Sequence, residues 1–281
     1  MPSIVVLGSV NLDIVAVADR LPVAGETVTD AELGRYPGGK GANQALAAQR
    51  LGAEVSLVAR VGTDSAAEEA LALLREGGVD LANVIAVEDA ATGVALIAVA
   101  ASGENQIVVA PGANRSLLSE SLEIPAADAL ICQLEIPTEA VAHAAANFKG
   151  FFSANLAPAR HVNVTVLQRA DLIVLNETEA AWYGDSLSAC AGMVAITFGA
   201  AGAVLTRNGE DIARAKPPRV EAVDTTGAGD AFTAALTVAL VEGQTPEEAL
   251  NFACAAGAAA TTKKGAQPSL PTRSDVLQLL A

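Results

Sequence analysis

Short apolar runs alternate with helix-like segments along most of this chain. The runs are almost continuously apolar and are bounded by Gly, Asp, Asn or Pro; they are Ile4–Leu7, Val55–Val61, Ala129–Leu134, Phe151–Ala154, Leu172–Leu175 and Met193–Phe198. Strands without polar alternation are typical of a sheet covered on both faces. Because helical patterns lie between them, the sequence predicts βαβ units and an α/β fold with a mainly parallel sheet.

The helical segments carry recognisable start and stop signals. Over Asp64–Glu76 the alanines and leucines fall on one stripe, Ser65 and Glu68 have the spacing of a capping box, and Gly77 ends the pattern. The C-terminal part predicts three more helices, Gly229–Glu242, Pro246–Thr262 and Thr272–Ala281, the last with Thr272 as N-cap.

Two segments break the alternation of strands and helices. Thr92–Ala100 and Gln106–Ala110 flank a loop that contains Gly103, as in a hairpin, and Asp13–Tyr36 is extended without helical periodicity. Both are too polar on one side for a doubly covered sheet. We therefore expect residues 13–36 and 92–110 to form a small β accessory over one edge of a body made of residues 1–12, 37–91 and 111–281.

The composition excludes several classes of protein. With 17 basic and 32 acidic residues the net charge of the 281-residue chain is −15, so its surface should repel nucleic acid. Three scattered cysteines and two histidines exclude a disulfide framework and make a zinc site unexpected. Apolar stretches such as Phe252–Ala260 are too short to cross a bilayer, and the N-terminus lacks the features of a signal peptide. We expect a cytoplasmic protein with no membrane partner.

A first glycine-rich loop, Gly38–Ala45, opens a helix. Gly34-x-x-x-x-Gly39-Lys40 imitates the start of a P-loop, but position 41 is Gly instead of Ser or Thr, and no buried strand precedes it. A nucleotide-binding P-loop is therefore rejected. The free N–H groups of such a loop can still approach a ligand closely, and Lys40 and Asn43 add polar contacts.

A second glycine-rich loop, Asp224–Phe232, also opens a helix. Gly227, Ala228 and Gly229 have almost no side chain, so their amides can converge on an anion, and Asp230 places a carboxylate beside them. Phosphoryl transfer to an alcohol needs both a proton acceptor and stabilisation of anionic charge. Each loop alone could equally be an ordinary connection; their occurrence together favours a site. Neither fits the G-x-G-x-x-G pattern of dinucleotide enzymes.

Together the two loops resemble the ribokinase family of carbohydrate kinases. Gly38–Ala45 is similar to the family's sugar-site motif and Asp224–Phe232 to its catalytic motif. The resemblance covers nearly the whole chain and includes, in order, Gly8–Asp13, Gly62–Asp64, Pro111–Asn114, Gln133–Glu135, Asn176–Glu179, Thr197–Gly199 and Gly265–Ser269.

The resemblance implies a three-layer α/β/α body with a β lid, ATP-dependent phosphorylation of D-ribose at its 5-hydroxyl, and a homodimer paired through the lid. It makes Asp230 the base on that hydroxyl and the Gly227, Ala228 and Gly229 amides the anion hole. The residues that it assigns to the sugar are Asn11, Asp13, Gly39, Lys40, Gly41, Asn43 and Glu135.

The resemblance also implies a nucleotide site and two kinds of cation. The residues assigned to ATP are Asn176, Glu179, Thr197, Gly199, Ala200, Gly202, Gly229 and Cys254. Asn176 and Glu179 are also assigned to the Mg²⁺ that accompanies ATP. A monovalent cation, usually K⁺, is assigned to Asp224 and Thr226 and to oxygens around Ala260, Lys263, Gly265 and Ser269. All of these ligands are oxygens, as a hard cation prefers.

The chain departs from the family pattern at two places. The segment Trp182–Cys190 leaves little room for a full helix-loop-helix, and Cys254 stands where many relatives place Asn or another polar residue near the adenine. Two alternatives remain open: a kinase for another pentose or a nucleoside, and a non-catalytic sugar-binding sensor. The intact Asp230 argues against the sensor, because binding alone requires no base.

Overall fold

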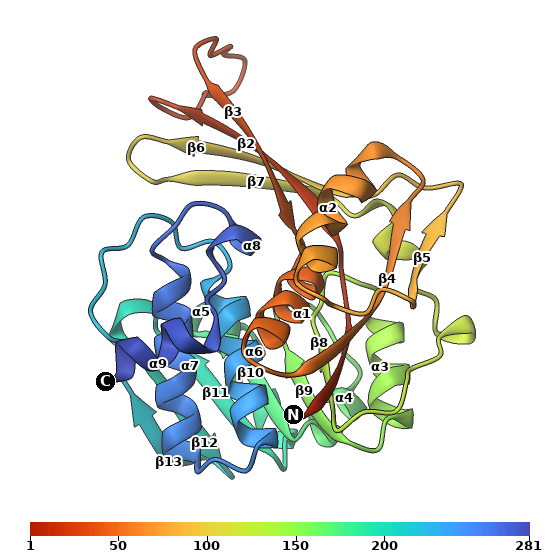
Figure 1. The fold of residues 1–281 in the computed structure, drawn as a ribbon, viewed down its shortest axis with the longest axis vertical. Coiled ribbons are helices and arrows are strands. Elements are labelled where there is room, and N and C mark those ends of the chain that lie inside the picture. Colours follow the sequence, from red (N-terminus) through yellow and green to blue (C-terminus); the bar gives the residue numbers. More distant parts are fainter.

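A central sheet and the helices on its two faces form the body. The computed structural model describes the backbone of residues 1–281 and every side chain except that of Ser121. Within it the strand order of the large sheet is β13-β12-β11-β10-β9-β8-β1-β4-β5 (Figure 1). Their bounds are Glu210–Ala215, Ala203–Arg207, Met193–Thr197, Leu172–Asn176, Phe151–Asn155, Ala129–Cys132, Ser3–Leu7, Glu54–Gly62 and Val84–Val87. All neighbours from β11 to β5 are parallel, and β12 and β13 add an antiparallel edge.

Helices cover both faces of this sheet, which confirms the predicted three-layer α/β fold. Along β1, Ile4 and Val6 pack under α1, α2 and α6, whereas Val5 and Leu7 pack against α3 on the opposite face. The first layer contains α1 (Lys40–Arg50), α2 (Ser65–Glu76), α6 (Ala228–Val241), α7 (Pro246–Ala260) and α9 (Arg273–Leu280), with the short α8 (Ala266–Ser269) following α7. The second contains α3 (Thr138–Asn147), α4 (Val164–Arg169) and α5 (Glu177–Tyr183).

The start of α2 differs from the sequence expectation. Asp64, not Ser65, is the N-cap: its carboxylate accepts hydrogen bonds from the backbone N–H of Ala67 and from Thr92. Glu68 pairs instead with Arg75. The predicted capping box of Ser65 and Glu68 is therefore wrong, because the contact with Thr92, far along the chain, holds the Asp64 carboxylate at the helix start.

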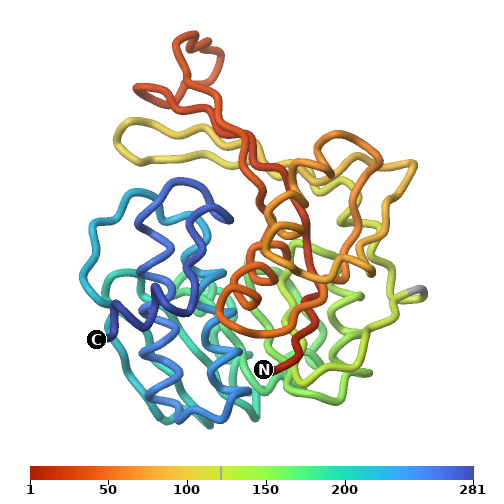
Figure 2. The backbone as a smooth tube through the Cα atoms, viewed as in Figure 1, coloured from red at the N-terminus to blue at the C-terminus, as the bar shows by residue number. Residues whose placement is uncertain are grey.

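A second, four-stranded sheet has the order β3-β2-β6-β7, with bounds Glu32–Gly38, Asn11–Ala18, Gly93–Ala100 and Asn105–Ala110. The hairpin of β6 and β7 was expected from the sequence and is confirmed. Strands β2 and β6 pair in parallel, which joins the two inserts into one sheet. This sheet, called the lid below, projects from the body as two long arms (Figure 2).

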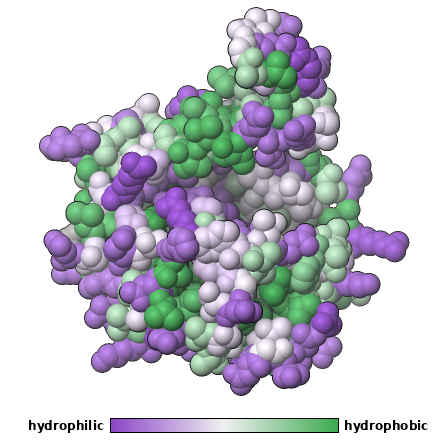
Figure 3. Space-filling view, turned by 180° about the vertical axis from the view of Figure 1, so that it is seen from behind, coloured by the Kyte–Doolittle hydropathy of each residue, from purple (hydrophilic) through white to green (hydrophobic). Residues whose placement is uncertain are grey.

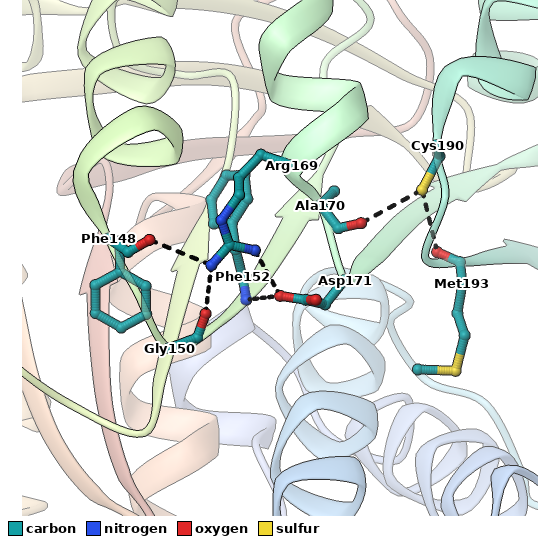
Figure 4. Close-up of polar contacts among 8 residues, drawn as sticks. All are labelled: Phe148, Gly150, Phe152, Arg169, Ala170, Asp171, Cys190 and Met193. Atoms are coloured by element: carbon teal, nitrogen blue, oxygen red, sulfur yellow. Dashed lines mark hydrogen bonds and ion pairs between the residues drawn. The ribbon is translucent and has the colours of Figure 1, made fainter.

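The short connection between β10 and β11 is closed by one small helix and a 3₁₀ segment, Gly184–Ala189. At the amino ends of the adjoining strands, Arg169 donates to the carbonyls of Phe148 and Gly150 and pairs with Asp171 (Figure 4). The Cys190 thiol points at the carbonyls of Ala170 and Met193. These contacts tie together the amino ends of the strands, at the end of the sheet opposite the glycine-rich loops. Among the described residues, no helix is long and apolar enough to cross a membrane.

Candidate functional site

The two glycine-rich loops meet at the carboxyl ends of the central strands. The Asn43 side chain, on α1, donates its Nδ2–H to Asp230 Oδ2 at 2.8 Å. The neighbouring Gln44 donates its Nε2–H to Asp230 Oδ1, also at 2.8 Å. The predicted base and a predicted sugar-site residue, 187 positions apart in the sequence, are thus direct neighbours.

Glu135, just after β8, gathers a second group of predicted residues. Its Oε2 accepts from Ser9 Oγ at 2.6 Å, from the Lys40 backbone N–H at 3.1 Å and, at a longer 3.5 Å, from Asn11 Nδ2. Asn114 adds a contact that sequence reasoning did not assign: its Nδ2 donates to Asn11 Oδ1 at 2.8 Å. The amide of Asn11 is therefore fixed in orientation at the base of the lid.

Asp13, on β2, lies close enough to Glu135, Asp230 and Lys40 to interact with their charges. Its carboxylate packs so closely on Gly38 that a Cβ there would lie 2.3 Å from Oδ2. Burial, followed by the negative charges of Glu135 and Asp230, raises the pKa of Asp13 to about 7, although Lys40 opposes the shift. Near neutral pH this carboxyl can therefore either donate or accept a hydrogen bond.

Lys40 is the cation at the centre of this acidic group. Burial lowers the pKa of Lys40, but the carboxylates of Asp230, Glu135, Glu179 and Asp13 outweigh burial and leave it above its ordinary value. For Asp230, burial is the largest effect and raises the pKa, whereas Lys40, Asn43 and Gln44 lower it. Lys40 thus lies within reach of the charges on both the predicted sugar side and, through Glu179, the predicted nucleotide side.

The start of α6 leaves room for a ligand. Gly227 adopts φ +81°, and Ala228 donates its backbone N–H to the Thr225 carbonyl at 3.2 Å, which closes the turn. A Cβ on Gly229 would meet nothing within 4 Å. The first turn of a helix exposes N–H groups and the positive end of its dipole, so this open space suits an anion.

The predicted nucleotide residues surround the ends of β10, β11 and β12. Asn176 and Glu179 form a capping box at the start of α5, and Thr197 is paired with Asn176 across the parallel strands. Gly199, Ala200 and Gly202 form the turn between β11 and β12, which the Phe198 backbone closes by donating to the Gly202 carbonyl at 2.8 Å. Cys254, on α7, is buried in the core under this edge, and burial raises the pKa of its thiol to about 11.

The residues assigned to a monovalent cation are partly linked by direct contacts. Asp224 accepts from the Thr226 N–H and hydroxyl with Oδ1 and from the Gly265 N–H at 2.8 Å with Oδ2. The Asp224 backbone also donates to the carbonyl of Thr261, which follows Ala260. Lys263 lies in the same turn, and Ser269 Oγ donates to the Ala266 carbonyl. Among the described residues, no group of three His, Cys, Asp or Glu side chains could hold a metal. The contacts of Asp224 bring together one carboxylate with hydroxyl and carbonyl oxygens, and oxygen donors suit a hard cation better than a soft one.

Sequence reasoning gave no function to Gln44, Asn155 and Ser9, although all three are buried at this site. The available signal was weak: each is a polar residue within or beside an apolar run. Tyr36, the last residue of the expected lid, was also missed. A Cβ on Gly265 would lie only 2.8 Å from Cδ1 of the Tyr36 ring. The lid therefore contacts the loop assigned to the cation.

The chain is similar to known proteins over nearly their full length. The family model described as pfkB family carbohydrate kinase matches residues 1–273. The chain is 39% identical to a ribokinase of Haemophilus influenzae, covering 99% of this chain and 98% of that protein. It superimposes on a Thermotoga maritima ribokinase with a TM-score of 0.91 at 34% identity, covering 100% and 99% of the two chains. An Arabidopsis thaliana ribokinase complexed with ribose and ATP gives a TM-score of 0.87 at 33% identity, covering 99% and 98%.

Proposed function

Because this chain belongs to the pfkB family of carbohydrate kinases, we propose that it transfers the γ-phosphoryl group of ATP to the 5-hydroxyl of D-ribose. The observation that carries the proposal is the position of Asp230. This buried carboxylate is held by two amides of α1, beside the open space at the start of α6.

Asp230 acts as the base in the proposed reaction. An alcohol is far too weak an acid for a carboxylate to ionise it beforehand, so Asp230 orients the 5-hydroxyl and takes its proton as the new P–O bond forms. The N–H groups of Gly227, Ala228 and Gly229 stabilise the charge on the phosphoryl oxygens. To bind a phosphoryl oxygen, the Ala228 N–H must release the Thr225 carbonyl to which it now donates.

The sugar lies among Asn11, Asp13, Asn43 and Glu135, over the backbone of Gly39, Lys40 and Gly41. Carboxylates accept hydrogen bonds from hydroxyls and amides do both, which suits a neutral polyol. Asn43 Oδ1 is buried and has no donor among the described residues. A sugar hydroxyl supplies the donor that this oxygen needs, which supports the assignment.

ATP occupies the edge formed by Asn176, Glu179, Thr197 and the turn Gly199–Gly202, with Gly229 at its phosphates and Cys254 below its base. Asn176 and Glu179 are the polar groups on this edge that would hold the phosphates and Mg²⁺, and the metal would supply neutralisation of phosphate charge. The oxygens of the Asp224 and Gly265 region would hold K⁺, which would supply positive charge beside the peptides leading to the anion hole.

The lid supplies the proposed dimer contact. Its strands expose several large apolar side chains, namely Leu33, Leu96, Ile107, Val108 and Val109. Figure 3 shows a hydrophobic area to the lower left of the projecting tip of the lid. Exposed apolar surface of this kind marks a contact with another protein, here a second copy of the chain. We also propose that the enzyme works in the cytoplasm, where ATP is supplied.

The test is ADP release from ATP with a panel of D-ribose, 2-deoxyribose, fructose, adenosine and pseudouridine, first in K⁺ and then in Na⁺ buffer. Fast turnover with ribose alone, increased by K⁺, supports both the sugar and the cation assignments. Turnover with another compound of the panel instead of ribose supports the kinase chemistry but shows that the substrate is another sugar or a nucleoside. Binding of ribose without any turnover supports the non-catalytic sensor and overturns the proposal.

A further inference from the structure

A chain of buried amides connects Asp230 to the middle of the central sheet. Gln133, after β8, donates its Nε2–H to Gln44 Oε1 at 2.7 Å. Gln44 donates its Nε2–H groups to Asp230 Oδ1 at 2.8 Å and to Asn155 Oδ1 at 3.0 Å. Asn155, at the end of β9, donates its Nδ2–H to the Val174 carbonyl of β10 at 3.0 Å.

The direction of hydrogen-bond donation along these amides is set by a backbone carbonyl. A carbonyl can only accept, so the Val174 oxygen requires the nitrogen of Asn155 to face it. The Asn155 oxygen then faces Gln44, which requires the nitrogen of Gln44 at that position, and the Gln44 oxygen must face Gln133. An ionised Asp230 can also only accept, so it and the sheet require the same orientation of Gln44.

The neighbouring backbone leaves little freedom for these amides to turn. Gln44 and Gln133 are fully buried, and a Cβ on Gly8 would lie 2.1 Å from Gln133 Oε1. The Gln133 side chain thus occupies the space that any larger residue at position 8 would need. Turning Gln44 over would place its oxygen against both Asp230 and Asn155 Oδ1 and leave two buried acceptors without donors.

We propose that Gln44 is a positioning residue for the base: it fixes Asp230 Oδ1, as Asn43 fixes Oδ2. This inference rests on the proposed function, in which Asp230 takes the proton of the sugar hydroxyl. With one amide on each oxygen, the carboxylate cannot rotate, and its remaining lone pairs are presented in a fixed direction.

The charged groups around Asp230 set the sign of the effect. Burial disfavours the ionised form of Asp230 most and Glu135 after β8 also disfavours it, whereas Lys40 on α1 favours it. Asp13 on β2 faces the same group, and the charge of Asp230 raises the pKa of Asp13. Removing the Gln44 donor leaves these effects in place and takes away a hydrogen bond to the charged form. The pKa of Asp230 therefore rises, and the acidic limb of the kcat–pH profile moves to higher pH.

The experiment compares kcat–pH profiles for the wild type, Gln44→Leu and Gln49→Leu. Gln49 lies on the same helix, and its amide oxygen accepts from the Val55 N–H away from Asp230, so it serves as the matched control. For Gln44→Leu we expect the acidic limb to move up by about one pH unit or more, in line with a lost bond to a charged group. The KM for ribose should change little. An unmoved limb in Gln44→Leu, or an equal shift in Gln49→Leu, overturns the proposal.

Two further variants keep the test decisive if Gln44→Leu folds poorly. Gln44→Glu retains the shape but places a second carboxyl beside Asp230, so its acidic limb should also rise. Gln133→Leu removes only the group that orients Gln44, so it should shift the limb in the same direction by less. If both profiles match the wild type, the proposal fails.

A titration that needs no turnover separates this inference from the proposed function. NMR of the protein labelled with ¹³C at aspartate carboxyls follows Asp230 directly, with Asp230→Asn identifying its signal. We expect its midpoint to rise in Gln44→Leu and to stay at the wild-type value in Gln49→Leu. If the protein is inactive on every panel substrate but still shows this shift, the proposed function is disproved and the inference about Gln44 stands. If the protein is active but shows no shift, the proposed function stands and the inference about Gln44 is disproved.

Discussion

At the scale of single residues, two glycines at the site differ in what a methyl group would meet. A Cβ on Gly41 would lie 2.5 Å from the backbone of Gly8 and Ser9, whereas one on Gly229 would meet nothing within 4 Å. Gly41→Ala must push α1 away from the end of β1 and should destabilise the protein by about 1–3 kcal/mol. Gly229→Ala should unfold at the wild-type temperature but turn over slowly, because its methyl occupies the proposed phosphoryl space. Thermal unfolding and ADP release measure the two effects, and equal loss of stability in both variants would contradict this account.

Asp230 is the residue on which the proposed chemistry depends. Asp230→Asn keeps the shape but cannot take the proton of the hydroxyl, so kcat should fall at least roughly 10²-fold while ribose binding largely survives. Calorimetry of ribose binding beside steady-state turnover makes the comparison. Near-normal turnover in Asp230→Asn would remove this carboxylate from the mechanism.

Asp13 makes the stability of the ligand-free protein depend on pH. Its pKa rises from 3.8 to about 7 on folding, so the folded state holds an extra proton between these values. Stability from this group is therefore lost as pH rises from about 4 to about 7. Asp13→Asn should unfold at a higher temperature than the wild type at pH 8, with a smaller difference at pH 5, and should bind ribose less tightly. If Asp13→Asn unfolds at pH 8 at a temperature no higher than that of the wild type, burial does not destabilise the ionised form of Asp13.

Which site residues could be anticipated depends on where their signal lies. Asp230, Asn43 and Glu135 belong to motifs that are contiguous in the sequence, so the resemblance identified them. Gln44 lies in the same motif as Asn43, but its proposed function depends on Asn155 and Val174, which the fold brings to it from β9 and β10. No spacing in the sequence encodes that contact.

At the scale of secondary-structure elements, two capping boxes offer a controlled comparison. Asn176 caps α5 at the proposed nucleotide edge. Thr245 caps α7 in the same way, and its side chain accepts from the Glu248 N–H. Asn176→Ala and Thr245→Ala should each cost about 1 kcal/mol of stability. Only Asn176→Ala should raise the KM for ATP, by roughly tenfold if one hydrogen bond to the nucleotide is lost. A similar rise in Thr245→Ala would mean that the effect comes from general loosening of the fold.

The elements themselves were predictable where burial dominates their sequence. Each of the six apolar runs predicted as strands contributes a strand of the central sheet, because a strand covered on both faces has few positions that favour polar residues. The strands β5, β12 and β13 were not anticipated, since they lie toward or at the sheet edges and carry exposed residues such as Ile85, Arg207 and Glu210. The cap of α2 was misassigned because Asp64 and Ser65 are both good caps, and only the contact with Thr92 decides between them.

At the scale of the whole molecule, the lid and the body are joined at the site. The strands β2 and β3 carry Asn11, Asp13 and Tyr36 at their bases, so the proposed sugar site, the lid and the Gly265 loop share one framework. Any movement of the lid must therefore also move the residues proposed to bind the sugar. A lid fixed by a second copy of the chain would hold these ligands in place, which connects the proposed dimer to binding of the substrate.

The dimer is tested with neighbouring residues of β7. Ile107 and Val108 are both exposed, and because successive side chains of a strand point to opposite faces, a lysine at each position probes a different face of the lid. Sedimentation of the wild type should give twice the 28.2 kDa of one chain. One of Ile107→Lys and Val108→Lys should sediment as a monomer and show a raised KM for ribose, while the other remains a dimer and acts as its control. A wild type that sediments at the mass of one chain, or a dimer that survives both lysines, would show that the lid is not the contact between subunits.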